Sequence, residues 1–329
     1  MTMKTEVSIF MVTYNHKNYI RKAIESVLAQ KTNFPFVLVI GDDASTDGTS
    51  QIVREFEEKF PAKIKALISK DNLGPMLNSK KVLEHCDGKY IAMLEGDDYW
   101  TDISKLQKQY DFLEENKKFS LCFHDINIID RNDEIISSNS ANIHRYYNKR
   151  DISKEELLFG PFVLNTCTMF FMNIKVPEWY VDFLTGDKVF QRLLSFHGNG
   201  YFLDENMANY RKHSSSLTKS KMWPKDIDYE SNEIKLFQNL SSLAPNEEIS
   251  NYIKANIRFL DLKRSVKQRK SLFSKISLIF NLRRGIKETF IIINPFKPVL
   301  PIYKYIIGYD WLSRRIEWHV GRFFFRKKN

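Results

Sequence analysis

The stretch YIAMLEGDDYW at residues 90–100 places two adjacent aspartates directly after a run of apolar residues. The run has the composition of a buried strand, and Gly96 allows the acidic turn to approach other groups closely. The same order, an apolar run and then a polar cluster, occurs in VSIFMVTYN at residues 7–15 and in FVLVIGDDASTDG at residues 36–48. Ligands of a parallel α/β sheet bind at the carboxyl ends of its strands, so we expect these clusters to form one site.

Helices are predicted between these strands. Apolar residues at helical spacing indicate helices near 17–30, 48–60 and 76–86, and Asp47 is a candidate N-cap for the second of them. Lysine alternates with apolar residues in KIKALI at residues 63–68, as in a half-exposed strand. The alternation of strand and helix predicts an α/β fold with a doubly wound, mostly parallel sheet and helices on both faces.

The regular alternation of strand and helix ends after residue 100. Helices are predicted near 103–116 and 187–196, and VLNTCTMFFM at residues 163–172 is strand-like. This part is typical of an α+β extension across the ligand edge of the sheet. Beyond about residue 225 the pattern is helical.

We therefore expect a catalytic domain over residues 1–225. It divides at about residue 100 into two halves, about 1–100 and about 101–225. Residues 226–329 would form a helical, basic and aromatic-rich C-terminal extension.

Charge is distributed unevenly along the chain. Residues 262–329 hold 17 Lys and Arg against three acids, a net charge of +14, whereas the other 261 residues hold 33 basic and 37 acidic residues, a net of −4. A basic tail on a slightly acidic body indicates an anionic partner surface. Nucleic acid is not expected, because no recognised binding motif accompanies the charge.

The tail mixes its cations with aromatic residues. Its longest apolar segment, at residues 290–308, contains three prolines and two lysines, so a membrane-spanning helix is not expected. WLSRRIEWHVGRFFFRKK at residues 311–328 suits a helix that lies in a membrane interface. The alternative is a basic helix packed on the protein's own surface.

The three cysteines give neither a zinc spacing nor a disulfide framework, which favours a reducing compartment. The N-terminal residues enter a strand almost at once, so we expect no signal peptide. We expect a cytoplasmic protein that is peripheral on the inner face of the cell membrane.

The paired acids of GDDYW indicate a cation. Adjacent carboxylates repel each other unless a cation lies between them, and Mg²⁺ binds one or two carboxylates together with substrate phosphates. A GDD by itself is often a solvated turn, so its meaning depends on the other clusters. In those clusters, Asp43 could accept a hydrogen bond from a base or a ribose, and Tyr14 is either a stacking surface for a base or a core residue.

Taken in chain order, VSIFMVTYN, IGDDASTDGT, DNLG and YIAMLEGDDYW resemble the motifs of family-two glycosyltransferases with the GT-A fold. TGDK at residues 185–188 and YRKHSSS at residues 210–216 are similar to the acceptor-side motifs of that family, and the resemblance covers about residues 5–218. It implies an inverting, metal-dependent enzyme that transfers a sugar from a nucleotide-sugar, expected to be a UDP-sugar. The nucleotide-sugar would bind to the half at about 1–100 and the acceptor to the half at about 101–225. The acceptor would be a saccharide or a lipid-linked hydroxyl in the synthesis of surface polysaccharides.

The resemblance also implies a role for each matching residue. Asp98, Asp97 and His213 would hold Mg²⁺ or Mn²⁺, with Asp98 as the direct ligand, and Asp187 would be the general base. The residues that would bind the donor are Thr13, Tyr14, Asn15, Asp43, Asn72, Lys80, Asp97 and Arg211. Many members have Ala-Arg-Asn after the NxG motif, whereas this chain has Leu-Asn-Ser-Lys at residues 77–80. Lys80 would supply part of the missing charge.

Alternatives remain open on the sequence. Asp187 also fits the N-terminal cap of a helix, and His213 fits a structural histidine. A nucleotidyltransferase would also use paired acids and a metal, although TYNHKN is a poor phosphate loop. The third alternative is a non-catalytic module that binds a nucleotide-sugar or a glycan. A dehydrogenase is disfavoured because no GxGxxG follows the first strand.

Overall fold

A computed structural model describes residues 5–138, 149–160, 164–183, 185–213 and 228–268. The strands are β1 (Val7–Thr13), β2 (Phe36–Asp42), β3 (Ile64–Ile68), β4 (Tyr90–Glu95), β5 (Tyr99–Trp100), β6 (Phe119–Ile129), β7 (Ile135–Ser137), β8 (Asp151–Ile152), β9 (Phe170–Met172) and β10 (Asn199–Arg211). The α-helices are α1 (Ile20–Leu28), α2 (Thr49–Lys59), α3 (Pro75–Leu83), α4 (Lys105–Glu115), α6 (Lys154–Phe159), α7 (Gly186–Leu194), α8 (Tyr229–Ser241) and α9 (Glu247–Gln268). The short 3₁₀ helices are η1 (Thr166–Thr168) and η2 (Glu178–Asp182).

The strands form one sheet in the order β3-β2-β1-β4-β9-β6-β10-β5, and β7 and β8 pair with β6 and β10. β1 pairs in parallel with β2 and β4, β2 with β3, and β6 with β10. β9 lies antiparallel between β4 and β6, so the long strands on its two sides keep one direction. The short β5, β7 and β8 are antiparallel to their partners. The predicted α/β fold with a mostly parallel sheet is therefore confirmed.

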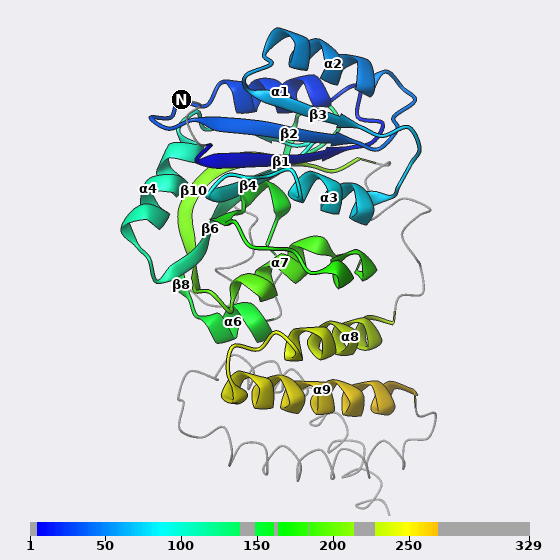
Figure 1. Ribbon diagram of the computed structural model, residues 1–329, viewed down its shortest axis with the longest axis vertical. Helices are drawn as coiled ribbons and strands as arrows, with labels where there is room; N and C mark the ends of the chain where they lie inside the picture. The colour runs from blue at the N-terminus through cyan, green and yellow to red at the C-terminus, as the bar shows by residue number, and fades with distance from the viewer. Residues whose placement is uncertain (1–4, 139–148, 161–163, 184, 214–227, 269–329) are drawn as a thin grey trace, which may run out of the picture.

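Helices cover both faces of the sheet (Figure 1), and each face has its own core. Along β1, Val7, Ile9 and Met11 pack with α1, α2 and α4, whereas Phe10 packs on the other face with α3, α6 and α7. This alternation is the period of two that a strand imposes on its side chains. Fully burying a side chain of this size contributes roughly 1.5–3 kcal/mol. The two cores thus hold the sheet rigidly, and the polar clusters follow at the ends of its strands.

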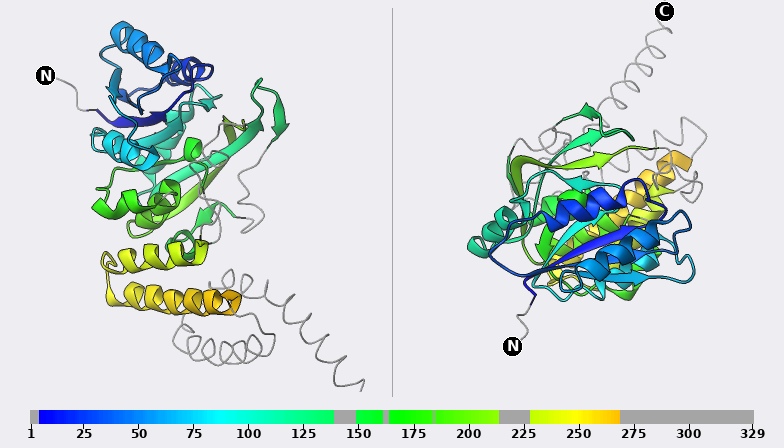
Figure 2. Two further views of the ribbon diagram at one scale, coloured as in Figure 1. Left: turned by 90° about the vertical axis from the view of Figure 1, so that its right-hand side faces the viewer. Right: turned by 90° about the horizontal axis from the view of Figure 1, so that it is seen from above.

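Helices α8 and α9 lie side by side below α6 and α7 (Figures 1 and 2). Phe237 of α8 belongs to the same core as α7. Glu233 of α8 accepts a hydrogen bond from Arg192 of α7 at 2.6 Å and pairs with Lys188 as well. The Arg192 guanidinium also lies 4.3 Å from the centre of the Phe237 ring. The first helix of the C-terminal region is therefore joined to the helix that carries Asp187.

The segment 163–172 differs from the prediction of one strand. A 3₁₀ turn at Thr166–Thr168 precedes a strand of only three residues, Phe170–Met172. The Thr168 hydroxyl donates to the Asn165 carbonyl at 2.7 Å, which stabilises a turn in place of an extended chain. The strand prediction was thus wrong for the first part of this segment.

The predicted domain boundary near residue 225 falls within 214–227, outside the described residues, and it stays a prediction. The structure confirms helices after it as far as residue 268, and the basic tail beyond that point also lies outside the described residues. Within the described ranges, every helix is too short or too polar to cross a membrane. All three cysteines are buried and free.

Candidate active site

The parallel register brings three strand ends to one level. Thr13 at the end of β1 pairs with Asp42 of β2, and its neighbour Val12 pairs with Glu95 of β4. The amide of Gly96 then donates to the Val12 carbonyl at 3.0 Å. The polar residues that follow these strands are therefore neighbours, as the sequence predicts.

Asp97 follows β4 and lies between two histidines. Its Oδ2 is 2.9 Å from Nε2 of His213, which follows β10, and 3.8 Å from Nε2 of His16, which follows β1. The two imidazole rings meet edge to face with their centres 6.1 Å apart, and the ring of Tyr19 packs against His213. Residues from three strand ends thus converge on one carboxylate.

Asp98 is buried, with 1% of its surface exposed. Its Oδ1 accepts a hydrogen bond from the backbone amide of Arg211 at 2.8 Å. Its Oδ2 is also buried and has no hydrogen-bond partner among the described residues, and the one side-chain donor that lowers the pKa of Asp98 is the weak thiol of Cys167. An ionised carboxylate oxygen in this position lacks a strong partner, which is the environment that a cation would complete.

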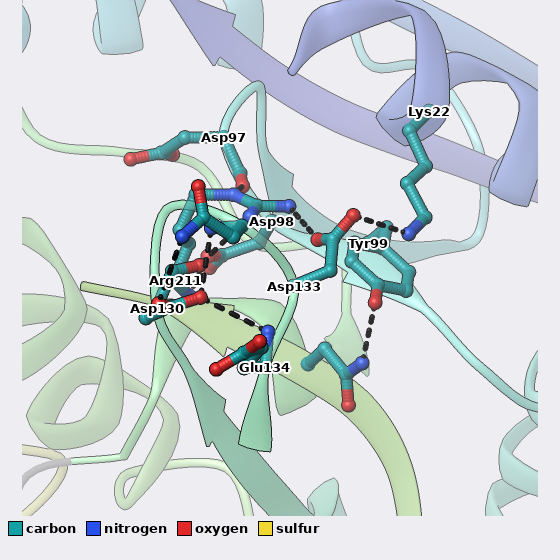
Figure 3. A network of polar contacts seen from close by, with 10 residues as sticks. Lys22, Asp97, Asp98, Tyr99, Asp130, Asp133, Glu134 and Arg211 are labelled. Atoms are coloured by element: carbon teal, nitrogen blue, oxygen red, sulfur yellow. Dashed lines mark hydrogen bonds and ion pairs between the residues drawn. The ribbon is translucent and has the colours of Figure 1, made fainter. Parts of the chain in front are cut away.

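Arg211 holds the acidic turn in place (Figure 3). Its Nε donates to the Asp97 carbonyl at 2.9 Å and its Nη1 to the Asp130 carbonyl at 3.0 Å. Its Nη2 donates to Asp133 at 2.5 Å, and Asp133 also pairs with Lys22 of α1 at 2.8 Å. The Asp97 side chain points away from this network in Figure 3. The guanidinium thus ties the acidic turn to the turn between β6 and β7. The predicted contact of Arg211 with the donor stays a prediction.

The three acids at the end of β4, which are Glu95, Asp97 and Asp98, lie close enough together to shift one another's pKa values. Burial, together with the charges of Asp97 and Asp187, raises the pKa of Glu95 to about 8. Burial and the charges of Asp97 and Glu95 raise the pKa of Asp98 well above its usual range. Burial alone would raise the pKa of Asp97 too, but His16 and His213 outweigh it and lower that pKa. Carboxyl groups are therefore concentrated where the protein supplies few compensating charges, and a cation bound there would favour their ionised forms.

Two sets of side chains meet the spacing that a metal ion requires. Glu95, Asp97 and Asp98 form one, and His16, Asp97 and His213 form the other, with the ligand atoms of each set within 4.8 Å of one another. Asp97 belongs to both. The carboxylates, the orphaned Asp98 oxygen and the imidazoles fit a divalent cation.

The end of β2 forms a second part of the site. Both oxygens of Asp43 accept backbone hydrogen bonds, from Leu73 at 2.7 Å and from Gly74 at 2.9 Å. The Asp43 amide donates to the Thr13 carbonyl at 3.1 Å, and the Asn72 side chain donates to the Asp43 carbonyl at 3.1 Å. Three of the predicted donor-binding residues are thus joined. The contacts of Asp43 fix its carboxylate against the loop after β3.

The loop after β1 is fixed by the loop after β2. Asn15 has a φ of 56°, its amide donates to the Ser45 hydroxyl at 2.8 Å, and its side chain accepts from the Thr46 amide at 2.9 Å. Tyr14 is 41% exposed, so it is a surface residue and not a core residue. Asp47 accepts from the Lys17 amide at 3.0 Å. These contacts leave the Tyr14 ring accessible to a ligand.

Asp47 also accepts from the amide and the hydroxyl of Thr49, the first residue of α2. The N-cap position itself is held by Gly48. The prediction that Asp47 is the N-cap was therefore wrong by one position: Asp47 precedes the cap and accepts hydrogen bonds from Thr49 from there.

Lys80 lies on α3, where its ammonium pairs with Glu84 at 2.5 Å and with Glu178 at 3.2 Å. These ion pairs link α3 to η2. The predicted contact of Lys80 with the donor stays a prediction.

Asp187 lies in the first turn of α7, and burial raises its pKa. Its Oδ1 accepts a hydrogen bond from the Lys188 amide at 2.7 Å, and its negative charge contributes to the raised pKa of Glu95. Gly186 precedes it at a point where a Cβ would approach the Tyr180 hydroxyl to 2.4 Å. The N-cap position of α7 belongs to Thr185, not to Asp187. A partly buried carboxylate with a raised pKa, whose charge acts on Glu95 of the acidic cluster, is suited to accept a proton.

The sequence patterns did not single out His16 or Glu95. Each is adjacent to a motif that was singled out, His16 to TYN and Glu95 to GDDYW. A histidine one residue after the first polar cluster was the available signal. Its meaning depends on Asp97 and His213, which are 81 and 197 positions further along the chain.

Comparison with known proteins identifies similar chains. The sequence model of glycosyl transferase family 2 matches residues 8–176. The uncharacterized protein Rv1520 of Mycobacterium tuberculosis is 31% identical over 211 residues, which are 64% of this chain and 60% of that protein. The match thus covers less than two thirds of that relative's length.

Two further relatives match shorter segments. The putative teichuronic acid biosynthesis glycosyltransferase TuaG of Bacillus subtilis is 37% identical over 34% of this chain and 43% of its own length. The UDP-Glc:alpha-D-GlcNAc-diphosphoundecaprenol beta-1,3-glucosyltransferase WfaP of Escherichia coli is 35% identical over 34% of this chain and 43% of its own length.

Among solved structures, S. aureus TarS 1–349 in complex with UDP-GlcNAc superposes with a TM-score of 0.57 and 18% sequence identity. The superposition covers 86% of this chain and 81% of TarS 1–349. At this identity the likeness shows the fold, and the predicted GT-A architecture is confirmed.

Proposed function

The chain belongs to glycosyl transferase family 2, and from that premise we propose that it transfers a sugar from a UDP-sugar to an acceptor hydroxyl with inversion at the anomeric carbon. The observation that carries the proposal is the arrangement of carboxylates. Three of them are clustered at the end of β4, and a separate, partly buried one, Asp187, lies in the first turn of α7. The cluster is suited to the leaving diphosphate and its cation, and the separate carboxylate is suited to the acceptor.

The donor would bind across the ends of β1 and β2. Tyr14 offers an exposed ring to the base, and the oxygens of Asp43 keep lone pairs that could accept from a base or a ribose. The names of similar proteins mention UDP, UDP-GlcNAc and UDP-Glc, which favours a uridine nucleotide. We therefore take UDP-sugars as the first donors to test.

Asp97, Asp98 and His213 would hold the cation, as Mg²⁺ or Mn²⁺. When bound, it would neutralise the charge that gathers on the diphosphate as the glycosidic bond breaks. The protein itself contributes a rigid acidic turn, because Arg211 ties the Asp97 carbonyl and Asp98 Oδ1 to the neighbouring turn. The carboxylates are therefore held in place before the donor arrives.

Asp187 would accept the proton of the acceptor hydroxyl as that oxygen attacks the anomeric carbon. One base on the side opposite the leaving group is sufficient for a single displacement, and a single displacement inverts the anomeric centre. Burial raises the pKa of Asp187, which makes the carboxylate a stronger base than an exposed aspartate.

The acceptor would be a saccharide or a lipid-linked saccharide at the cytoplasmic face of the membrane. The name of WfaP mentions a diphosphoundecaprenol acceptor, and that of TuaG mentions teichuronic acid biosynthesis. The net charge of +14 over residues 262–329 would attract anionic lipid and bring the enzyme to such an acceptor.

The test is release of UDP from UDP-glucose, UDP-GlcNAc and UDP-galactose with Mn²⁺, with Mg²⁺ or with EDTA. We expect release with metal from at least one donor, and a loss of about 10²-fold or more in Asp98→Asn. The melting temperature of the variant shows whether it is folded. UDP binding without turnover over broad donor and acceptor panels would instead indicate a binding module. Pyrophosphate release from a nucleoside triphosphate would indicate a nucleotidyltransferase.

A further inference from the structure

His16 lies between β1 and α1 and is partly buried, with 17% of its side chain exposed. Its carbonyl accepts hydrogen bonds from Tyr19 and Ile20, both at 2.8 Å, which starts α1. The preceding Asn15 is fixed to the loop after β2. The imidazole is therefore carried by a constrained backbone.

The polar atoms of His16 lack the partners of a structural histidine. Nδ1 is buried and has no hydrogen-bond partner among the described residues. Nε2 is 3.8 Å from Asp97 Oδ2, which is too far for a hydrogen bond. The fully buried His124 differs in one nitrogen only: its Nδ1 lies 2.7 Å from the Asp125 carbonyl, whereas its Nε2 has no partner among the described residues. Neither nitrogen of His16 therefore has a hydrogen bond within the described residues, and Nε2, the nitrogen that faces Asp97, can offer its lone pair to a cation.

The surroundings of His16 leave room for close approach to the acidic turn. A Cβ at Gly96 would lie 3.1 Å from His16 Nδ1 and 2.6 Å from the Thr13 hydroxyl. Glycine therefore permits the imidazole to stand beside the turn. On the other side of Asp97 stands His213, and one ligand atom from each of the three residues lies within 4.8 Å of the others. Asp98, 1% exposed with an orphaned Oδ2, adjoins the same group.

We propose that His16 is a ligand of the cation, so that two imidazoles and the Asp97 carboxylate bind it together and the site prefers Mn²⁺ to Mg²⁺. This inference rests on the proposed function for the presence of a cation, and it deepens that function by adding a fourth side chain to Asp97, Asp98 and His213 and by assigning a choice of metal. Imidazole nitrogen suits transition metals, whereas Mg²⁺ prefers oxygen ligands and retains water. A set with two nitrogens therefore favours Mn²⁺.

The test measures metal binding to the full chain without donor or acceptor. Free Mn²⁺ is counted by electron paramagnetic resonance, and Mg²⁺ is titrated as a competitor. We expect the wild type to bind Mn²⁺ at least about tenfold more tightly than Mg²⁺. His16→Gln should weaken Mn²⁺ binding by about 10- to 100-fold and Mg²⁺ binding by less than about threefold. The matched control is His85→Gln, at the end of α3, which should change neither affinity.

Electron spin-echo modulation from ¹⁴N provides a direct count of the imidazoles on bound Mn²⁺. We expect two in the wild type, one in His16→Gln and two in His85→Gln. His16→Asn serves as a second variant if the glutamine variant does not fold.

An unchanged Mn²⁺ affinity and an unchanged nitrogen count in the folded His16 variants would overturn the inference, as would a wild type that binds Mg²⁺ as tightly as Mn²⁺. Because no sugar donor is present, these results are separate from the proposed function. A protein that binds Mn²⁺ through two imidazoles but transfers no sugar would contradict only the proposed function.

Discussion

Replacing Lys105 by methionine should remove a pH-dependent loss of stability. Lys105 is the first residue of α4 and is fully buried. Its ammonium donates to the Gln109 side chain at 2.6 Å and lies 4.1 Å from the centre of the Trp100 ring. Burial, which neither contact offsets, lowers the pKa of Lys105 from 10.5 to about 7. In the folded protein this lysine is therefore about half neutral at pH 7.

The sign follows from the protons that each state binds. Between pH 7 and pH 9 the unfolded chain keeps Lys105 protonated, whereas the folded protein releases the proton, so stability rises with pH. With pKa values of about 7 and 10.5, this lysine destabilises the fold by about 4 kcal/mol at pH 7 and by about 2 kcal/mol at pH 9. The expected gain from pH 7 to pH 9 is therefore about 2 kcal/mol.

The assay is urea unfolding of the wild type, Lys105→Met and Lys108→Met at pH 7, 8 and 9 under reducing conditions and constant ionic strength. The difference in unfolding free energy between the wild type and Lys105→Met should change by about 2 kcal/mol over this range, in favour of the wild type at high pH. Loss of the Gln109 hydrogen bond adds an offset of about 1 kcal/mol that does not depend on pH. Lys108 is partly exposed and pairs with Asp102 and Glu205, which raise its pKa, so it stays charged over this range and Lys108→Met should give a constant difference. A constant difference for Lys105→Met as well would refute the reasoning, because the buried lysine would then stay charged.

Three further predictions concern activity and location. Because burial raises the pKa of Asp187, kcat/KM should fall with decreasing pH through a pKa above the ordinary carboxyl range; a profile that stays flat down to about pH 4 would contradict this role. Glu233 joins α8 to two cations of α7, so Glu233→Gln should lower kcat about tenfold with little change in donor KM. Asp182→Asn, which breaks an exposed ion pair of the same helix, should change neither constant, and equal effects of the two variants would exclude a positioning role. Removal of residues 269–329 should abolish sedimentation with anionic lipid vesicles, whereas unchanged sedimentation would place the membrane contact elsewhere.

Much of the fold is predictable because its signals are local. The apolar runs of β1, β2 and β4 and the polar clusters after them are continuous in sequence, and helical spacing indicates α1 to α4. The insertion of β9 between β4 and β6 is different. That strand has three residues and follows a turn stabilised by Thr168, so neither its length nor its antiparallel direction could be predicted from a periodic pattern.

The candidate site divides in the same way. Asp97, Asp98 and His213 were assigned to one metal site by their resemblance to family motifs, and the structure brings these residues together. His16 could not be assigned, because a single histidine carries no periodic signal and its neighbours lie far away in sequence. The contacts of Lys80 could not be predicted from the sequence either, because its partner Glu178 lies nearly one hundred residues further along the chain.

The central claim is that the acidic turn binds the donor while Asp187 performs the transfer. The most direct measurement compares the wild type and Asp187→Asn for Mn²⁺-dependent binding of UDP by calorimetry and for turnover of the best UDP-sugar. The account predicts equal UDP affinity in the two proteins and a loss of turnover of about 10²- to 10⁴-fold in the variant. Normal turnover in a folded Asp187→Asn protein would contradict it, because another group would then have to take the proton of the acceptor.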